Sequence, residues 1–236
     1  FSGADVASLI ITRGSKLNAI GTPSEPVIFT SAAPNPQSGD WGGIVILGRA
    51  KTNRTSEPTI EGGIGRPFGG TNDLDNSGVL KYVRIEFGGI PLSPNKEING
   101  ITFGSVGSGT QVDYIQVSYS GDDSFEWFGG TVNCKHLISY STTDDDFDTD
   151  FGYRGNVQFG LSIRNENLSD AAGDSNCFES DNDAGGTTAT PFTSGVFSNI
   201  TMVGPYRGAT TNTIATVTWS NENLDQLTII SASGQI

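Results

Sequence analysis

Apolar residues along this chain occur in short runs that alternate with polar residues, and no run shows helical spacing. Clear examples are residues 9–12, 27–30, 41–48 and 156–164, which are separated by turns rich in Gly, Pro, Asn and Asp. Short alternating runs bounded by such turns are typical of β-strands. The sequence therefore predicts an all-β protein.

One stretch, residues 112–152, contains two similar copies of the same pattern, each a β-rich run followed by an acidic run. Three pairs of corresponding residues are each 22 residues apart: Asp122 and Asp144, Phe125 and Phe147, and Glu126 and Asp148. A further pair, Phe178-Glu179, follows Phe147 after 31 residues, which is one period plus an insertion. A period near 22 predicts a β-solenoid, in which each coil buries its apolar face against its neighbours.

Other segments fit the same scheme. Residues 51–78 are polar and rich in Gly and Pro, so we expect a long excursion from the coil with at most one short strand. In residues 79–87 the alternation leaves open whether Tyr82 or Val83 faces inward. The last predicted strands cover residues 196–203, 213–219 and 224–230.

Four segments resemble bacterial secreted or surface-anchored right-handed parallel β-helix proteins, which have the pectate-lyase-like fold, and especially lipoproteins of the bacteroidetes type. They are residues 21–30, 39–48, 80–89 and 121–183. The resemblance covers essentially the whole chain. It implies an all-β fold, a single right-handed parallel β-helix domain over residues 1–236, and the chain length divided by the period predicts roughly eight to ten coils. It also implies an extracellular or bacterial outer-surface location, but not an activity, because most members of that group have none established.

Composition narrows the set of partners. The chain has 26 acidic and 13 basic residues, a net charge of −13 and a pI of about 4.3, so nucleic acid and anionic membranes are poor partners. No apolar run is long enough to predict a transmembrane segment. The chain opens as if within a coil, so we expect it to be part of a longer secreted protein. Cys134 and Cys177 occupy different points of the coil, and whether they form a disulfide is left open.

The acidic block is the strongest candidate for chemistry. If residues 144–150 are extended, alternation places four carboxylates on one face, and neighbouring coils add four more at a coil spacing of roughly 4.8 Å. The predicted metal ligands are Asp144, Asp146, Asp148, Asp150, Asp122, Glu126, Glu179 and Asp181. Carboxylates so close together repel one another, and Ca²⁺ suits such an oxygen-rich site. The alternative is a solvated acidic ridge that keeps the solenoid soluble.

Known calcium motifs are not present in this block. Residues 146–150 have the opening spacing of an EF-hand loop, but Phe151 stands where Gly is required and Val157 where the bidentate Glu belongs. The glycine-rich repeat of calcium-binding β-rolls is also absent.

Aromatic residues beside the acidic block suggest a second kind of site. Trp127, Tyr153 and Arg154 are the predicted ligand-binding residues, since exposed rings next to polar groups could stack on sugars. The alternative is that these rings pack in the core. The single histidine, His136, lies within a predicted strand and is interpreted as a structural residue.

Three functions are compatible with these features. The favoured hypothesis is a non-catalytic extracellular or cell-surface module that binds carbohydrate or another surface ligand, with calcium in the acidic block. The second is a polysaccharide lyase or glycoside hydrolase: Gly121-Asp122-Asp123 is similar to one element of the polygalacturonase pattern, although the other elements are missing, and Arg154 or Arg164 could serve a lyase. The third is a structural spacer or filament subunit that self-associates end to end through open coils.

Overall fold

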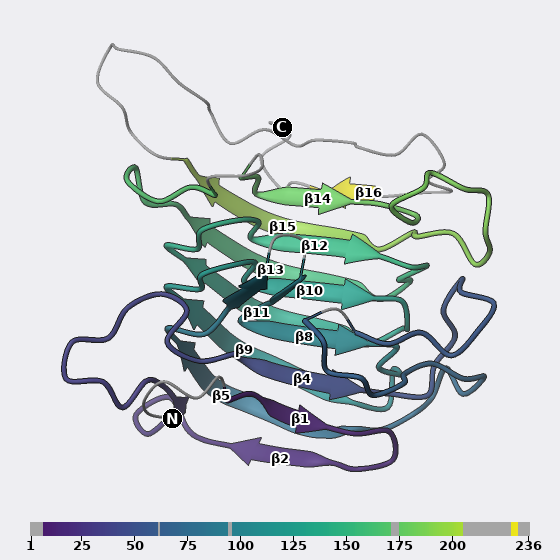
Figure 1. Ribbon diagram of the computed structural model, residues 1–236, viewed down its shortest axis with the longest axis horizontal. Coiled ribbons are helices and arrows are strands. Elements are labelled where there is room, and N and C mark those ends of the chain that lie inside the picture. The colour runs from purple at the N-terminus through teal and green to yellow at the C-terminus, as the bar shows by residue number, and fades with distance from the viewer. Residues whose placement is uncertain (1–6, 61, 94–95, 171–174, 205–227, 231–236) are drawn as a thin grey trace.

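The computed structural model describes residues 7–60, 62–93, 96–170, 175–204 and 228–230. Within these ranges the chain forms no helix, and its strands stack into two long parallel sheets that lie face to face (Figure 1). The chain advances along the stack from the N-terminal strands to the C-terminal ones, as the colour sequence shows (Figure 1). This is a right-handed parallel β-helix, as predicted.

Sheet A is all parallel and its strands follow one another in chain order. Its strands are β1 (Leu9–Ile11), β4 (Ile44–Leu47), β8 (Ile101–Gly104), β10 (Phe125–Phe128), β12 (Phe147–Asp150) and β14 (Phe178–Ser180).

Sheet B is also parallel and contains longer strands. Its strands are β2 (Leu17–Ile20), β3 (Val27–Phe29), β5 (Gly78–Glu86), β9 (Gln111–Ser118), β11 (Asn133–Tyr140), β13 (Asn156–Ile163), β15 (Val196–Val203) and β16 (Thr228–Ile230). A short antiparallel hairpin, β6 (Ile90–Ser93) with β7 (Lys96–Ile98), projects between two coils and was not predicted.

Residues that are one sequence period apart lie opposite each other in neighbouring strands of sheet A. Phe125 lies opposite Phe147, and Phe147 opposite Phe178, with ring centroids 5.7 and 5.3 Å apart. All three rings are buried, so they form a ladder inside the helix. The register continues from Phe147 to Phe178 across the insertion between them, which confirms the predicted solenoid period.

The long strands β5, β9, β11, β13 and β15 of sheet B each bend at one residue. β2 and β3 pair with the two halves of β5, and between these halves Tyr82 adopts the left-handed conformation, with a φ of 51°. This bend breaks the alternation, so Leu80 and Val83 are both buried while Tyr82 is only partly buried. The choice between Tyr82 and Val83 is thereby decided in favour of Val83.

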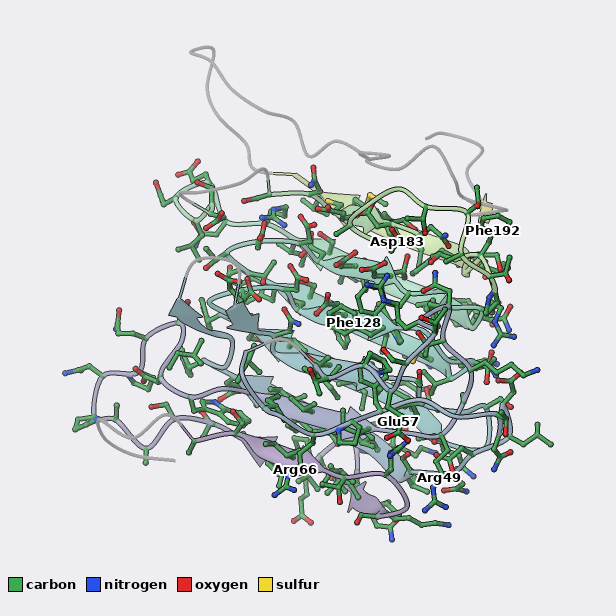
Figure 2. The ribbon with its side chains drawn as sticks, turned by 45° about the vertical axis from the view of Figure 1, so that its right-hand side comes forward. Arg49, Glu57, Arg66, Phe128, Asp183 and Phe192 are labelled. Carbon is green, nitrogen blue, oxygen red and sulfur yellow. The ribbon has the colours of Figure 1, made fainter. Side chains whose placement is uncertain are left out.

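The excursion covers the outer face of sheet A in the first coils. In its described part, residues 51–60 and 62–77 contain no strand beyond one isolated bridge between Thr59 and Pro67. Its residues Ile60 and Phe68 pack against Val45 and Phe128 in a second apolar cluster outside the coil. In Figure 2, Phe128 lies between Glu57, toward the N-terminal coils, and Asp183, toward the C-terminal coils. Apolar side chains therefore cover the outer face of sheet A in the first coils. The acidic residues of this face lie farther toward the C-terminal coils.

Several smaller predictions can also be compared with the structure. Cys134 and Cys177 are both buried and unbridged. The predicted strand at 213–219 lies outside the described residues, and the one at 224–230 ends in β16. In the described part of the chain there is no helix of the length and hydropathy needed to cross a membrane.

Candidate metal centre

Two consecutive coils carry an acidic turn directly before their strand of sheet A. Asp122 and Asp123 precede β10, and Asp144 and Asp145 precede β12. The backbone N–H of Asp145 donates to Asp123 Oδ1 at 2.9 Å, and the backbone N–H of Asn176 in the next coil donates to Asp145 Oδ1. Asp123 and Asp145 thus each accept a hydrogen bond from a backbone N–H of the following coil, and these bonds hold the acidic turns in register.

Three further carboxylates occupy one register position on successive strands. Glu126 of β10 lies opposite Asp148 of β12, which lies opposite Glu179 of β14. Their chain neighbours Phe125 and Phe147 point into the core, so these carboxylates lie on the outer face of sheet A.

The turns and the strands bring their carboxylates together. Ligand atoms of Asp123, Glu126 and Asp148 all lie within 4.8 Å of one another, and so do those of Asp122, Asp123 and Asp144. Asp123 belongs to both groups. We call these five residues the acidic centre, and its carboxylates are close enough together to hold a metal ion.

Several oxygens in and beside this centre are buried and lack a hydrogen bond within the described part of the chain. Asp144 Oδ1 and Asp148 Oδ1 are buried and accept no hydrogen bond from the described residues. Asn99, which is 1% exposed, donates through Nδ2 to Glu126 Oε2 and to Thr102 Oγ1, while no described residue donates to its own Oδ1. An unsatisfied buried acceptor costs about 1–3 kcal/mol. A cation beside these oxygens would remove that cost, so the residues present fit a metal.

The electrostatics of the centre favour either protons or a cation. Burial, followed by repulsion from neighbouring carboxylates, raises the pKa of Asp123 and of Asp148 well above the ordinary value for aspartate. The same two causes raise the pKa of Asp144 to about 7. For Asp145, burial and a hydrogen bond with Glu179 raise the pKa to about 11. A positive charge beside these groups would favour their ionised form, whereas burial and mutual repulsion favour the protonated form.

The remaining predicted acidic ligands lie farther along the sheet. Glu179 continues the ladder beyond Asp148 and contributes to its raised pKa. Asp150 lies at the end of β12, where burial and the neighbouring Asp181 raise its pKa to about 8, although Phe151 N–H and Arg54 oppose the shift. Asp150, Glu179 and Asp181 belong to neither group of closely spaced ligand atoms.

Asp146 does not share a face with Asp148, contrary to the prediction. It is fully buried and points inside the coil, where it accepts hydrogen bonds from Ser139 and Ser162 and pairs with Arg164 at 3.1 Å. The prediction fails because β12 begins only at Phe147, and the turn before it does not alternate. The carboxylate of Asp146 is satisfied by protein groups.

The predicted sugar platform is not present at Trp127 and Tyr153. Both rings are fully buried and stack on each other at 5.4 Å, and Tyr153 Oη donates to the carbonyl of Val132 at 2.9 Å. No ligand can reach them, so the core interpretation holds for these two rings. Arg154 lies at the surface and pairs with Asp73 at 3.3 Å.

Sequence reasoning missed three residues of this region: Asp123, Asp145 and Asn99. A signal existed for the first two, because Asp123 and Asp145 are also 22 residues apart and belong to the repeat. For Asn99 there was none, since it reaches Glu126 from an earlier coil across 27 residues of chain.

Comparison with known protein families supports the β-helix fold. The family model described as "pectate-lyase like beta helix domain" matches residues 2–234, which is nearly the whole chain. No curated protein and no solved structure gives a significant match.

Proposed function

Since the chain belongs to the pectate-lyase-like β-helix family, we propose that it is a non-catalytic member that binds calcium in the acidic centre and carbohydrate at an extracellular or bacterial outer surface. One observation supports the calcium site above all. Asp123, Glu126 and Asp148 bring ligand atoms within 4.8 Å of one another, and Asp148 Oδ1 is buried and accepts no hydrogen bond from the described residues.

Calcium is the cation that fits this donor set. The centre offers only oxygen ligands, which suit hard cations, whereas zinc prefers nitrogen and sulfur. Calcium accepts six to eight oxygens in flexible geometry, and magnesium demands a near-ideal octahedron. Asp123, Glu126 and Asp148 would supply the ligands, and Asn99 would orient Glu126. Bound there, the cation would neutralise the centre and offer a position for an oxygen of a ligand.

The ion pairs formed by the basic residues near the centre favour a non-catalytic role over a lyase. A lyase needs a base beside its carboxylates, and Arg164 and Arg154 were the candidates. Arg164 is nearly fully buried and pairs with Asp146, while Arg154 pairs with Asp73. The charged groups that dominate the pKa values of Asp123 and Asp148 are all carboxylates.

Calcium titration of chelator-treated protein by calorimetry, with thermal unfolding in parallel, tests the proposal. We expect saturable binding, and at calcium about 100 times above Kd a stabilisation of about 2.7 kcal/mol. For a chain of this length that corresponds to a rise in Tm of roughly 5–10 °C. Asp148→Asn should abolish both effects, whereas Glu25→Gln, the same kind of change at an exposed residue, should leave them intact.

Two outcomes would reject the proposal. Absence of saturable binding in the wild type would leave a protonated acidic face and favour the structural-spacer hypothesis. Unsaturated products or new reducing ends from an acidic polysaccharide would instead establish the lyase or hydrolase hypothesis, which family membership makes the second candidate.

A further inference from the structure

The acidic centre consists of two groups of carboxylates that meet at one residue. The first, which we call the strand group, contains Asp123, Glu126 and Asp148. The second, which we call the turn group, contains Asp122, Asp123 and Asp144. Within each group the ligand atoms lie within 4.8 Å of one another. Each group is therefore compact enough to hold a cation of its own.

The turn group follows from the repeat of the chain. Asp122 and Asp144 are equivalent residues of successive coils, so the distance between neighbouring strands, about 4.8 Å, brings them together. Asp123 joins the two groups. An ionised carboxylate can accept about four hydrogen bonds or metal contacts, so Asp123 can serve both groups while its Oδ1 also accepts the backbone N–H of Asp145 at 2.9 Å.

A single cation does not satisfy both groups. Asp148 Oδ1 in the strand group and Asp144 Oδ1 in the turn group are both buried, and neither accepts a hydrogen bond from the described residues. Among those residues, no group of closely spaced ligand atoms contains both Asp144 and Asp148. A cation in the strand group, beside the buried and equally unbonded Oδ1 of Asn99, therefore leaves Asp144 Oδ1 unsatisfied. A buried acceptor in that state is unfavourable.

The charge of the centre also exceeds that of one cation. Its five carboxylates carry a charge of −5 when all are ionised, so one calcium ion leaves −3 and two leave −1. Asp170 and Glu179 act on the Asp144 carboxylate as further negative charges, and Arg164 acts as a positive one. The guanidinium of Arg164 already pairs with Asp146 at 3.1 Å. A second cation beside Asp144 would compensate this excess of negative charge.

The backbone of the turn before β10 is held in place by neighbouring coils. The carbonyl of Asp122 accepts a hydrogen bond from Thr142 Oγ1. The carbonyl of Asp123 accepts hydrogen bonds from Ser120 Oγ at 2.7 Å and from the backbone N–H of Gly100 at 2.8 Å. The positions of these two aspartates are therefore set by the fold, and a site that is organised in advance loses less free energy on binding.

We propose that the acidic centre binds two calcium ions, one in the strand group and one in the turn group, with Asp123 as a ligand to both. The ion in the strand group binds first and fixes the Asp123 carboxylate. The turn group has only two carboxylates of its own, so its ion binds second and depends on the first. This inference rests on the calcium part of the proposed function and adds a second ion to it.

Calorimetry and native mass spectrometry of chelator-treated protein, titrated with calcium chloride, count the ions. We expect two calcium ions per chain in the wild type. Asp144→Asn should bind one ion and retain the tighter of the two affinities, and its Tm should rise less with calcium than that of the wild type. Asp148→Asn should bind none, because the second ion depends on the first.

Asp170→Asn is the matched control for Asp144→Asn. Asp170 acts on Asp144 as a nearby negative charge but belongs to neither group of ligand atoms. The two variants remove the same charge from the same region, and only Asp144→Asn removes a predicted ligand. Asp170→Asn should therefore still bind two ions. Asp122→Asn, which should also bind one ion, replaces Asp144→Asn if that variant fails to fold.

Lanthanide luminescence tests whether the two ions are neighbours. Terbium and holmium replace calcium at oxygen sites, and energy transfer from terbium to holmium falls steeply with distance. Mixed loading of the wild type should shorten the terbium lifetime relative to loading with terbium alone. The same mixture should leave the lifetime unchanged in Asp144→Asn, which has room for one ion.

The outcomes separate this inference from the proposed function. One calcium ion in the wild type would overturn the inference and leave the proposed function intact, whereas no bound calcium would reject both. Two ions in Asp144→Asn would place the second ion elsewhere. Equal loss of the second ion in Asp144→Asn and Asp170→Asn would show that charge alone matters, and an unchanged terbium lifetime in doubly loaded wild type would show that the ions are far apart. Each of these results would overturn the shared site.

Discussion

At the scale of single residues, the carboxyl groups of the acidic centre differ from ordinary surface aspartates because the fold encloses them beside one another. Asp123 is 8% exposed and Asp148 has one carboxylate oxygen wholly enclosed. Burial and mutual repulsion both favour the protonated form. The ionisation of these groups is therefore coupled to folding, and each becomes a source of pH-dependent stability.

The free energy of unfolding of chelator-treated protein should fall as the pH rises from about 4 to about 8. Asp144 has a pKa of about 7 in the folded protein and an ordinary value of 3.8. Between these values the folded state binds more protons than the unfolded state, so its stabilisation is complete below the lower pKa and is lost toward the upper one. One such group contributes a slope of at most about 1.4 kcal/mol per pH unit.

Urea unfolding at several pH values measures this slope. Asp144→Asn should flatten it, Glu25→Gln should not, and saturating calcium should stabilise the wild type most at the high end of the range. Identical slopes for the wild type and Asp144→Asn would mean that Asp144 is ionised in the folded protein.

At the scale of elements, a buried ion pair ties the acidic turn before β12 to the end of β13. Arg164, the residue after β13, pairs with Asp146 at 3.1 Å, with side chains 3% and 0% exposed. It also donates to the carbonyl of Asn176 at 2.9 Å and to that of Thr143 at 3.4 Å. The turn that carries Asp144 is thus anchored from inside the coil.

Arg164→Leu should lower the free energy of unfolding by about 3–5 kcal/mol, because it leaves the Asp146 carboxylate buried without its partner. Arg154→Leu removes a partly exposed pair with Asp73 and should cost only about 0–1 kcal/mol. Urea unfolding at constant pH compares the two variants. Similar small losses in both would show that Asp146 is stabilised by its serine partners alone.

At the scale of the whole molecule, the excursion after β4 connects coils that are distant in sequence. Asn53 donates through its backbone N–H to the carbonyl of Phe151 at 3.0 Å and through Nδ2 to that of Asn182 at 2.6 Å, across 129 residues of chain. Arg54 lies over the Phe151 ring, 4.4 Å from its centroid, and 3.8 Å from Asp183. A solenoid otherwise couples only neighbouring coils. We call these contacts of Asn53 and Arg54 the clamp. The clamp therefore adds cooperativity between distant coils.

Asn53→Ala should destabilise the protein by about 1–3 kcal/mol, since it leaves buried acceptors unpaired. Amide hydrogen exchange should accelerate in residues 178–183, far from the mutation in sequence. Asn156→Ala, at an exposed asparagine that bonds Asn133, should change stability by no more than about 0.5 kcal/mol. Unchanged exchange in residues 178–183 of the Asn53 variant would contradict the clamp.

The repeating parts of the protein could be predicted from the order of its amino acids. Alternation within runs gave the strands, and the offset of 22 residues aligned Phe125 with Phe147 and Glu126 with Asp148, as the register confirms. These predictions succeed because a parallel β-helix places equivalent residues of successive coils side by side, so a sequence period translates directly into contacts.

Which way each repeated residue faces, and whether it is buried, follows only from the folded structure. Alternation holds within a strand but not in the turn before it or at a left-handed bend, so Asp146 points inward and Tyr82 outward. Whether a ring is enclosed depends on how the coil closes around it, which buried Trp127 and left Tyr114 exposed. Facing direction at turns and bends is set by backbone geometry and by contacts between distant segments, and local sequence pattern does not encode either.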